Sequence, residues 1–276
     1  MSDCLEDVAA ELGLELVRHF DDGVFGAALV HDTEGQDLVL KAQPQPDLEP
    51  LWATGAAMAA QLRAGGYPSP RYTGVGRTGQ AVWSLQEHLP GRVVDQLTEP
   101  IATQLVGLAR RHAVDCGRRR PWRDDALAAA RGWLAELSPS LAPGDAAVLA
   151  AALDRGTEAE LLETTIVHGD FHHRNALVDG GGQVTGVFDW DLAGPGDWRF
   201  DLVMLAFGGR LQPAACDPGA LEVVSEAVST ECPDDVIALM TACQVLRIAS
   251  MTATRAPARA PVLVAKMTGA LADWLC

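Results

Sequence analysis

The chain has 276 residues, of which 48% are hydrophobic and 21% are charged, a composition typical of soluble globular proteins and not of disordered chains. Its six cysteines are scattered without a Cys-x-x-Cys pair, which argues against a disulfide scaffold and against a structural zinc or redox dithiol site. The net charge of −16 disfavours nucleic acid and anionic membrane as partners, because both attract cationic surfaces. A cationic small molecule would suit this charge.

The N-terminal residues show neither a basic segment nor an apolar run, so no targeting peptide is expected. No stretch of 18 consecutive apolar residues occurs, and therefore no membrane span is expected. We predict a cytoplasmic protein. Its oligomeric state is left open by the sequence.

The first third of the chain has a mixed pattern. Acidic and apolar residues alternate at helical spacing over residues 3–17, and a β-meander with two turns is predicted over 17–43. An Ala- and Leu-rich helix is predicted over 51–64, and two more strands over 67–89. Pro90 and Gly91 then punctuate the chain.

Helical patterns dominate the remainder. One β-like island interrupts them at residues 164–189. The predicted fold is therefore α+β, with a β-rich N-terminal lobe at 1–88 and a larger helical lobe at 89–276. The two lobes meet near residues 86–91. Ligand sites often lie where two lobes meet, so we expect a ligand site there. The predicted helices cover residues 98–115, 123–137, 144–163, 219–230, 234–253 and 258–275.

The β-like island carries the polar residues best suited to chemistry. Asp170 and Asn175 lie in a loop between two short strands, and Asp189 follows the next strand, residues 184–188. Phosphoryl transfer needs such a set, because Mg²⁺ takes oxygen ligands and a further carboxylate can deprotonate an attacking hydroxyl. His168, His172 and His173 suggest zinc as an alternative, although the flanking strands favour a loop over the helical face that a His-x₃-His site uses.

The run His168-Gly169-Asp170, followed by Asn175 and then by Asp189-Trp190, resembles the aminoglycoside phosphotransferase family, which includes choline kinase-like enzymes. This resemblance implies the bilobal protein-kinase-like fold, the cofactors ATP or GTP and Mg²⁺, and a role for each residue. Asp170 would be the catalytic base, and Asn175 and Asp189 would hold Mg²⁺. His168 would tie the loop to nearby backbone or to the metal-binding aspartate.

The resemblance extends to flanking segments. Asp201 would brace the catalytic loop from the following helix, and Lys41 would contact the α- and β-phosphates of the nucleotide. The loop from Phe20 to Gly26 would cover the phosphates. The hinge would offer backbone groups to the nucleobase and consists of Gln86, Glu87 and His88.

One feature departs from the family. Its N-lobe helix usually carries a glutamate that pairs with the strand lysine, and that position falls near Gly55 in this sequence. The nearest acid is Glu49, just before Pro50. Either Glu49 substitutes for the glutamate from a shifted helix, or Lys41 has no carboxylate partner.

Three functions agree with the motif. The first is a phosphotransferase that acts on a hydroxyl of a cationic antibiotic, such as an aminoglycoside or a basic cyclic peptide of the viomycin or capreomycin type, and so confers resistance. Asp191, two residues after Asp189, would lie at the rim of the site and bind the cationic acceptor. The alternatives are a kinase of a small hydroxylated metabolite and an inactive nucleotide-binding module.

Overall fold

The computed structural model describes residues 2–20, 26–79 and 81–275. The chain forms two compact units. The first contains Met1–Val94, His168–Asp170 and Arg174–Gly194, and the second contains Asp95–Val167, Phe171–His173 and Pro195–Cys276. The first unit thus extends past the predicted lobe boundary at residue 88. It also includes the later segments that carry Asp170, Asn175 and Asp189.

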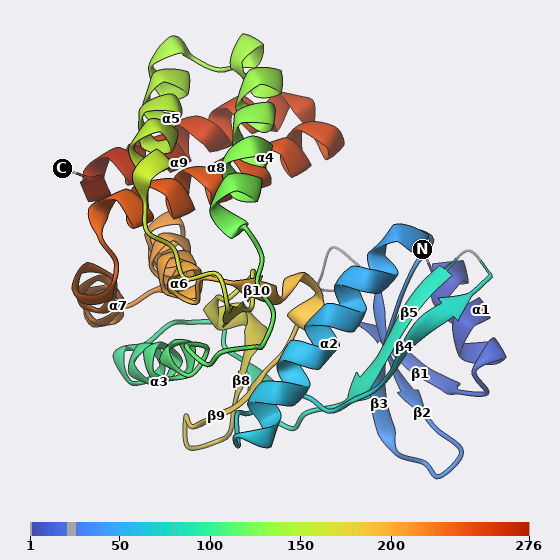
Figure 1. Ribbon diagram of the computed structural model, residues 1–276. Coiled ribbons are helices and arrows are strands. Elements are labelled where there is room, and N and C mark those ends of the chain that lie inside the picture. The colour runs from blue at the N-terminus through green and yellow to red at the C-terminus, as the bar shows by residue number, and fades with distance from the viewer. Residues whose placement is uncertain (1, 21–25, 80, 276) are drawn as a thin grey trace. The chain divides into compact units, whose positions relative to one another are not determined.

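The first unit is built on a five-stranded antiparallel sheet with strand order β1-β2-β3-β5-β4 (Figure 1). The first three strands form the predicted meander, and β4 and β5 are the two further strands predicted over 67–89. The strands are β1 (Glu15–Phe20), β2 (Ala27–His31), β3 (Asp37–Gln43), β4 (Tyr72–Thr78) and β5 (Ala81–Glu87).

The first helix, α1 (Ser2–Glu11), packs on one face of this sheet. Its Leu5 joins an apolar core with Leu38 and Leu40 of β3. The helix is shorter than the predicted 3–17 because Gly13 takes a left-handed φ of 68°, and Leu14 N–H donates to the Ala9 carbonyl at 2.9 Å. This bond closes the helix as in a Schellman motif.

Helix α2 (Glu49–Ala64) follows the short turn η1 (Pro46–Leu48) and lies beside β4 (Figure 1). Since side chains alternate along a strand, Lys41 lies on the sheet face opposite Leu40. Lys41 pairs with Ser84 of β5.

A second, three-stranded sheet in this unit has the order β6-β8-β9. It comprises β6 (Arg92–Val93), β8 (Ala176–Val178) and β9 (Val184–Val187). Asp179 makes the turn between β8 and β9, where its Oδ1 accepts from the N–H groups of Gly181 and Gln183 at 2.8 and 2.9 Å. The loop that carries Asp170 and Asn175, the predicted catalytic loop, comes before this hairpin and ends in the short turn η4 (His173–Asn175). The short turn η5 (Trp190–Leu192) follows the hairpin.

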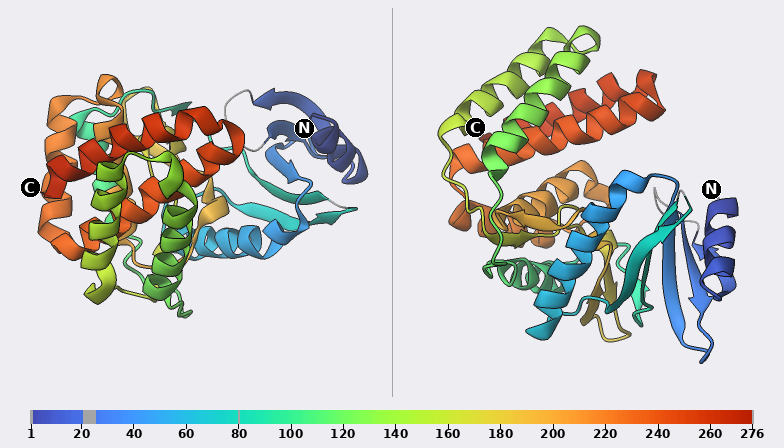
Figure 2. Two further views of the ribbon diagram at one scale, coloured as in Figure 1. Left: turned by 90° about the horizontal axis from the view of Figure 1, so that it is seen from above. Right: turned by 45° about the vertical axis from the view of Figure 1, so that its right-hand side comes forward.

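The second unit is mainly helical (Figures 1 and 2). Within it, α8 packs against α4, α5 and α9. Helix α6, which carries Asp201, was implied by the family resemblance but not by the helical pattern of the sequence. The helices are α3 (Glu99–Arg110), α4 (Trp122–Leu137), α5 (Pro143–Arg155), α6 (Arg199–Leu211), α7 (Pro218–Glu231), α8 (Asp234–Arg255) and α9 (Ala260–Leu275), with the short turns η2 (Ser138–Ser140), η3 (Gly156–Glu158), η6 (Pro213–Ala215) and η7 (Pro257–Arg259).

Two short segments, β7 (Thr165–Val167) and β10 (Gly194–Gly196), pair with each other. Among the described helices, α8 alone is long and apolar enough to cross a membrane by length and composition. However, 67% of its most apolar window is buried inside the structure, which is the environment of a helix in a protein core.

Candidate active site

Lys41 lies between two carboxylates at the end of the β8–β9 hairpin. Its Nζ is 2.6 Å from Asp189 Oδ1 and 2.8 Å from Asp191 Oδ2. The Lys41 side chain is only 10% exposed, so its charge needs both partners. All three residues belong to the first unit.

The two acids decide the charge state of this cluster. Burial alone would lower the pKa of Lys41, but the charges of Asp191 and Asp189 outweigh it and raise that pKa above its usual value. Burial would raise the pKa of Asp189, and the neighbouring Lys41 lowers it below its usual value instead. Lys41 is therefore a cation and Asp189 an anion at neutral pH.

Asp189 has an unusual backbone. It is the only described non-glycine residue with a positive φ, at 68° with ψ 52°. Left-handed backbone is strained for such residues and clusters at functional sites. Here the conformation turns the chain from the end of β9 into η5, so Asp189 and Asp191 both reach Lys41.

The catalytic loop is held against the hairpin by hydrogen bonds. Asn175 Nδ2 donates to the Asp170 carbonyl at 2.8 Å and to Asp170 Oδ2 at 3.2 Å. Phe188 N–H donates to the Asn175 carbonyl at 3.0 Å. These bonds bring Asp170, Asn175 and the segment before Asp189 together.

His168 is fully buried below this loop. Its Nδ1 accepts from the Asp170 N–H at 3.3 Å, which leaves Nε2 as the donor to the Phe188 carbonyl at 2.9 Å. The ring also lies 4.5 Å from the Trp190 ring, centroid to centroid. His168 thus connects the backbone of the Asp170 loop to the backbone at the end of β9.

The donor set fits Mg²⁺ better than zinc. The amide nitrogen of Asn175 faces Asp170, so its amide oxygen is available, and Asp189 adds a carboxylate. Mg²⁺ takes one or two carboxylates together with phosphate and water oxygens. Zinc would need three or four His, Cys or acidic ligands, and no such group of three occurs within the described residues.

The sheet face that carries Lys41 is polar. Gln43, Ser84 and Gln86 lie on it by strand register, and each is at most 5% exposed. Each also buries one side-chain atom without a hydrogen-bond partner, namely Gln43 Nε2, Ser84 Oγ and Gln86 Oε1. Such atoms are rare in folded proteins, and a polar ligand on this face would satisfy them.

The predicted hinge forms the end of β5. Glu87 N–H donates to the Arg71 carbonyl at 2.8 Å, and His88 N–H donates to the Asp37 carbonyl at 3.4 Å. Both N–H groups are therefore engaged within the sheet. A nucleobase bound here would use other backbone groups of Gln86, Glu87 and His88 than these two donors. The predicted phosphate cover cannot be described, because residues 21–25 lie outside the described part of the chain.

Two sequence-based placements were wrong. Asp191 does not lie at an exposed rim, because its side chain is 4% exposed and binds Lys41. For Lys41, neither sequence-based alternative holds, because Glu49 forms an ion pair with Arg77 and Lys41 does have carboxylate partners, Asp189 and Asp191. The rim prediction for Asp191 assumed an extended chain, whereas residues Trp190–Leu192 form a tight turn.

In the second unit, Asp201 begins helix α6 and is fully buried. Its Oδ2 lies 2.8 Å from His112 Nδ1. The His112 ring packs edge-on against Phe171, with ring centroids 5.3 Å apart. Because Phe171 directly follows Asp170 in the chain, this contact links Asp201 to the catalytic loop through His112, a residue that the sequence analysis did not single out.

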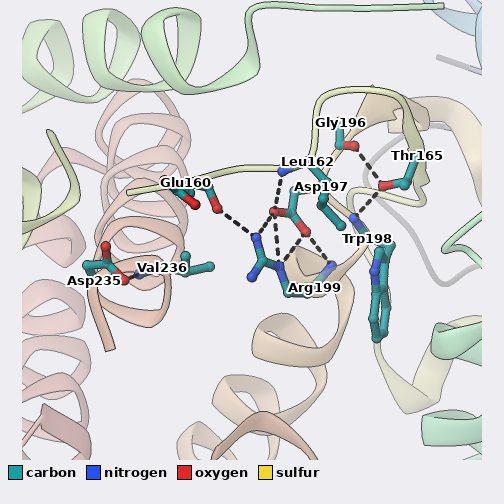
Figure 3. A network of polar contacts seen from close by, with 9 residues as sticks. All are labelled: Glu160, Leu162, Thr165, Gly196, Asp197, Trp198, Arg199, Asp235 and Val236. Carbon is teal, nitrogen blue, oxygen red and sulfur yellow. Dashed lines mark hydrogen bonds and ion pairs between the residues drawn. The ribbon is translucent and has the colours of Figure 1, made fainter. Parts of the chain in front are cut away.

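Asp197 is a second buried acid in this unit (Figure 3). It accepts from the Arg199 N–H at 3.0 Å, as in an Asx-turn just before α6, whose N-cap is Trp198. It also accepts from the Leu162 N–H at 3.0 Å and binds the Arg199 guanidinium at 2.6 to 3.1 Å. Arg199 in turn donates to the Glu160 carbonyl at 2.9 Å. Asp197 thereby fixes the start of α6 to residues 160–162.

The sequence matches the model of the phosphotransferase enzyme family over residues 23–226. No curated protein matches it. Among solved structures, a thermostable mutant of aminoglycoside phosphotransferase APH(4)-Ia, in ternary complex with ADP and hygromycin B, has a TM-score of 0.70 to this chain at 16% identity, over 98% of both chains.

Two further structures are similar. Macrolide 2′-phosphotransferase MphH from Brachybacterium faecium has a TM-score of 0.62 at 22% identity, over 96% of this chain and 97% of its own. An aminoglycoside-3′-phosphotransferase of type VIII has a TM-score of 0.65 at 23% identity, over 88% and 98%. These similarities confirm the predicted α+β, protein-kinase-like fold.

Proposed function

Because the chain belongs to the phosphotransferase enzyme family, we propose that it transfers the γ-phosphate of ATP or GTP to a hydroxyl of a cationic antibiotic. The observation that carries this proposal is the cluster of Lys41, Asp189, Asn175 and Asp170 in the first unit. It combines a cation for phosphates, oxygen ligands for a metal and a further carboxylate. Phosphoryl transfer requires these three elements.

Each residue has one task in this proposal. Lys41 binds the α- and β-phosphates, and Gln86, Glu87 and His88 lie beside the nucleobase. Asp189 and the amide oxygen of Asn175 hold Mg²⁺, which neutralises phosphate charge when it is bound. Asp170 orients the acceptor hydroxyl and takes its proton. The hydrogen bond from Asn175 fixes the orientation of the Asp170 carboxylate.

The charge of the cluster supports a divalent cation. Asp189 and Asp191 both pair with the single cation Lys41, and Asp170 adds a further carboxylate close enough to act on the pKa of Asp189. Buried charges need compensation. A bound Mg²⁺ would balance the excess of negative charge and would free Lys41 from Asp189 for the phosphates.

The acceptor is proposed from two observations. The net charge of −16 attracts polycations through the long-range field, and similar structures are phosphotransferases for hygromycin B and macrolides. An aminoglycoside meets both conditions, and a basic cyclic peptide of the viomycin or capreomycin type meets the first. The cytoplasm supplies the nucleotide. A hydroxylated metabolite remains the second candidate acceptor, since the catalytic residues would be the same.

The test is a panel of acceptors incubated with labelled ATP or GTP and Mg²⁺. We expect phosphate on an aminoglycoside or a basic cyclic peptide and little on choline or a neutral sugar. Asp170→Asn should lose most of kcat while binding of AMP-PNP survives. Asp47→Asn removes an exposed carboxylate from the same unit and should leave kcat unchanged.

Salt provides a second readout. Exposed charges are screened over about 8–10 Å at physiological salt, so the acceptor KM should rise with ionic strength more steeply than the nucleotide KM. A KM that stays flat, with transfer to a neutral acceptor, would establish a metabolite kinase instead. Magnesium-dependent nucleotide binding without transfer to any acceptor would establish an inactive nucleotide-binding module.

A further inference from the structure

The two acids that form ion pairs with Lys41 differ in their exposure to solvent. The Asp189 side chain is 37% exposed, whereas the Asp191 side chain is 4% exposed. Asp189 can therefore bind a ligand from solution while Asp191 cannot. If Asp189 binds the metal–nucleotide, Asp191 is the acid that remains for Lys41.

Helix α2 supplies no acid at this point. Its single acid is Glu49 in the first turn, which binds Arg77. Gly55 lies in the middle of α2, and a Cβ built there would lie 2.0 Å from the Trp190 carbonyl oxygen. The helix therefore has room for the backbone of the Trp190–Leu192 turn only because residue 55 lacks a side chain.

This turn is fixed from its other side. Trp190 is fully buried, and its Nε1 donates to the Val187 carbonyl at 2.9 Å. Its ring packs edge-on against Tyr67, with centroids 5.6 Å apart, and Ala193 N–H donates to the Trp190 carbonyl at 3.0 Å. The turn cannot retreat from α2 without breaking these contacts, so Asp191 is held toward Lys41.

We propose that Asp191 is the positioning residue that keeps Lys41 in place for phosphate binding, and that Gly55 is the complementary change on α2 that makes room for it. The inference rests on the proposed function, because it assigns Asp189 to the metal–nucleotide. It gives Lys41 a carboxylate partner from the turn after the metal-binding aspartate instead of from the helix.

The chain offers a direct spectroscopic test, because Lys41 and Lys266 are its only lysines. Protein labelled with ¹⁵N-lysine then has only two labelled side-chain ammonium groups. Lys266 is exposed, so exchange with water should remove its signal in every sample, and it is the control for an unprotected lysine. An ammonium signal is retained when ion pairing and burial slow exchange with water. In the wild type, the Lys41 signal should persist after addition of Mg²⁺ and AMP-PNP.

In Asp191→Asn, the Lys41 signal should be lost when Mg²⁺ and AMP-PNP are added. A signal that persists there as in the wild type would overturn the inference. If Asp191→Asn does not fold, Gly55→Ala carries the same test, since it displaces the turn. Wild-type protein that fails to bind Mg²⁺ and AMP-PNP at all would refute the proposed function as well, so the two failures are distinguishable.

Kinetics give an independent readout. Asp191→Asn should lower kcat at least tenfold in the wild type and have almost no further effect in a Lys41→Met background, because residues that act through one another are not additive. Equal fold-losses in both backgrounds would mean that Asp191 acts by another route, and the inference would fail.

Discussion

Replacing Gly55 by alanine tests the close approach between α2 and the Trp190 turn. An added Cβ would lie 2.0 Å from the Trp190 oxygen, whereas real Cβ contacts essentially never fall below 3.0 Å. The helix or the turn must therefore move by about 1 Å, and forced movements of this kind in packed regions cost about 1–3 kcal/mol. The better helix propensity of alanine returns about 1 kcal/mol.

We therefore expect Gly55→Ala to be about 0–2 kcal/mol less stable than the wild type. Gly132 in α4 is the matched control, because a Cβ there has no atom within 4 Å. Gly132→Ala should gain about 1 kcal/mol from the same change in propensity. Urea unfolding of the two variants measures the difference, which isolates the cost of the clash.

Activity provides the second half of this test. Because the displaced turn carries Asp191, Gly55→Ala should lower kcat, although residue 55 contacts neither substrate in the proposed function. Gly132→Ala should leave kcat unchanged. If both variants are stabilised equally and both keep full activity, the close packing of α2 on the turn has no functional consequence and the reasoning is refuted.

Three further results are expected. Asp189→Asn should weaken the binding of AMP-PNP in the presence of Mg²⁺ and leave it unchanged in EDTA, as titration calorimetry can show; equal weakening under both conditions would remove Asp189 from the metal site. Asp201→Ala should destabilise the protein by about 1–3 kcal/mol in urea unfolding, because it leaves buried His112 without its carboxylate partner; an unchanged midpoint would contradict this. Burial raises the pKa of Cys243 to about 12, so only about 10⁻⁴ of it is thiolate at pH 8, and mass spectrometry should find iodoacetamide on the partly exposed Cys116 long before Cys243.

The local patterns in the sequence predicted most of the elements well. The turn residues of the meander and the Asp179–Gln183 turn have side-chain or glycine signals that act within a few residues. For this reason, the hairpin that carries Asn175 and Asp189 was located closely. Helix α1 ended early because Gly13 adopts a left-handed conformation, and a single glycine inside a helical pattern does not by itself indicate a helix end.

The partners of Lys41 could not be predicted in the same way. Its acids lie about 150 positions away in the chain, and their approach depends on the tight turn at Trp190 and on the packing of α2. The absence of a glutamate near Gly55 was visible in the sequence. The close approach of the Trp190 carbonyl oxygen to Gly55 was not, because it depends on the packing of a distant segment. Similarly, His112 has no local motif, and only the fold brings it to Asp201.

The position of the acid that holds Lys41 bears on how this enzyme can be controlled. In protein kinases, the lysine is held by a glutamate on a helix, so displacing that helix switches the enzyme off. Here the acid Asp191 lies two residues from Asp189 on the same short turn. If the inference above holds, the metal-binding acid and the acid that positions Lys41 lie in one short turn, and a displacement of α2 that leaves this turn intact would not disconnect Lys41. A fold arranged in this way is suited to continuous activity.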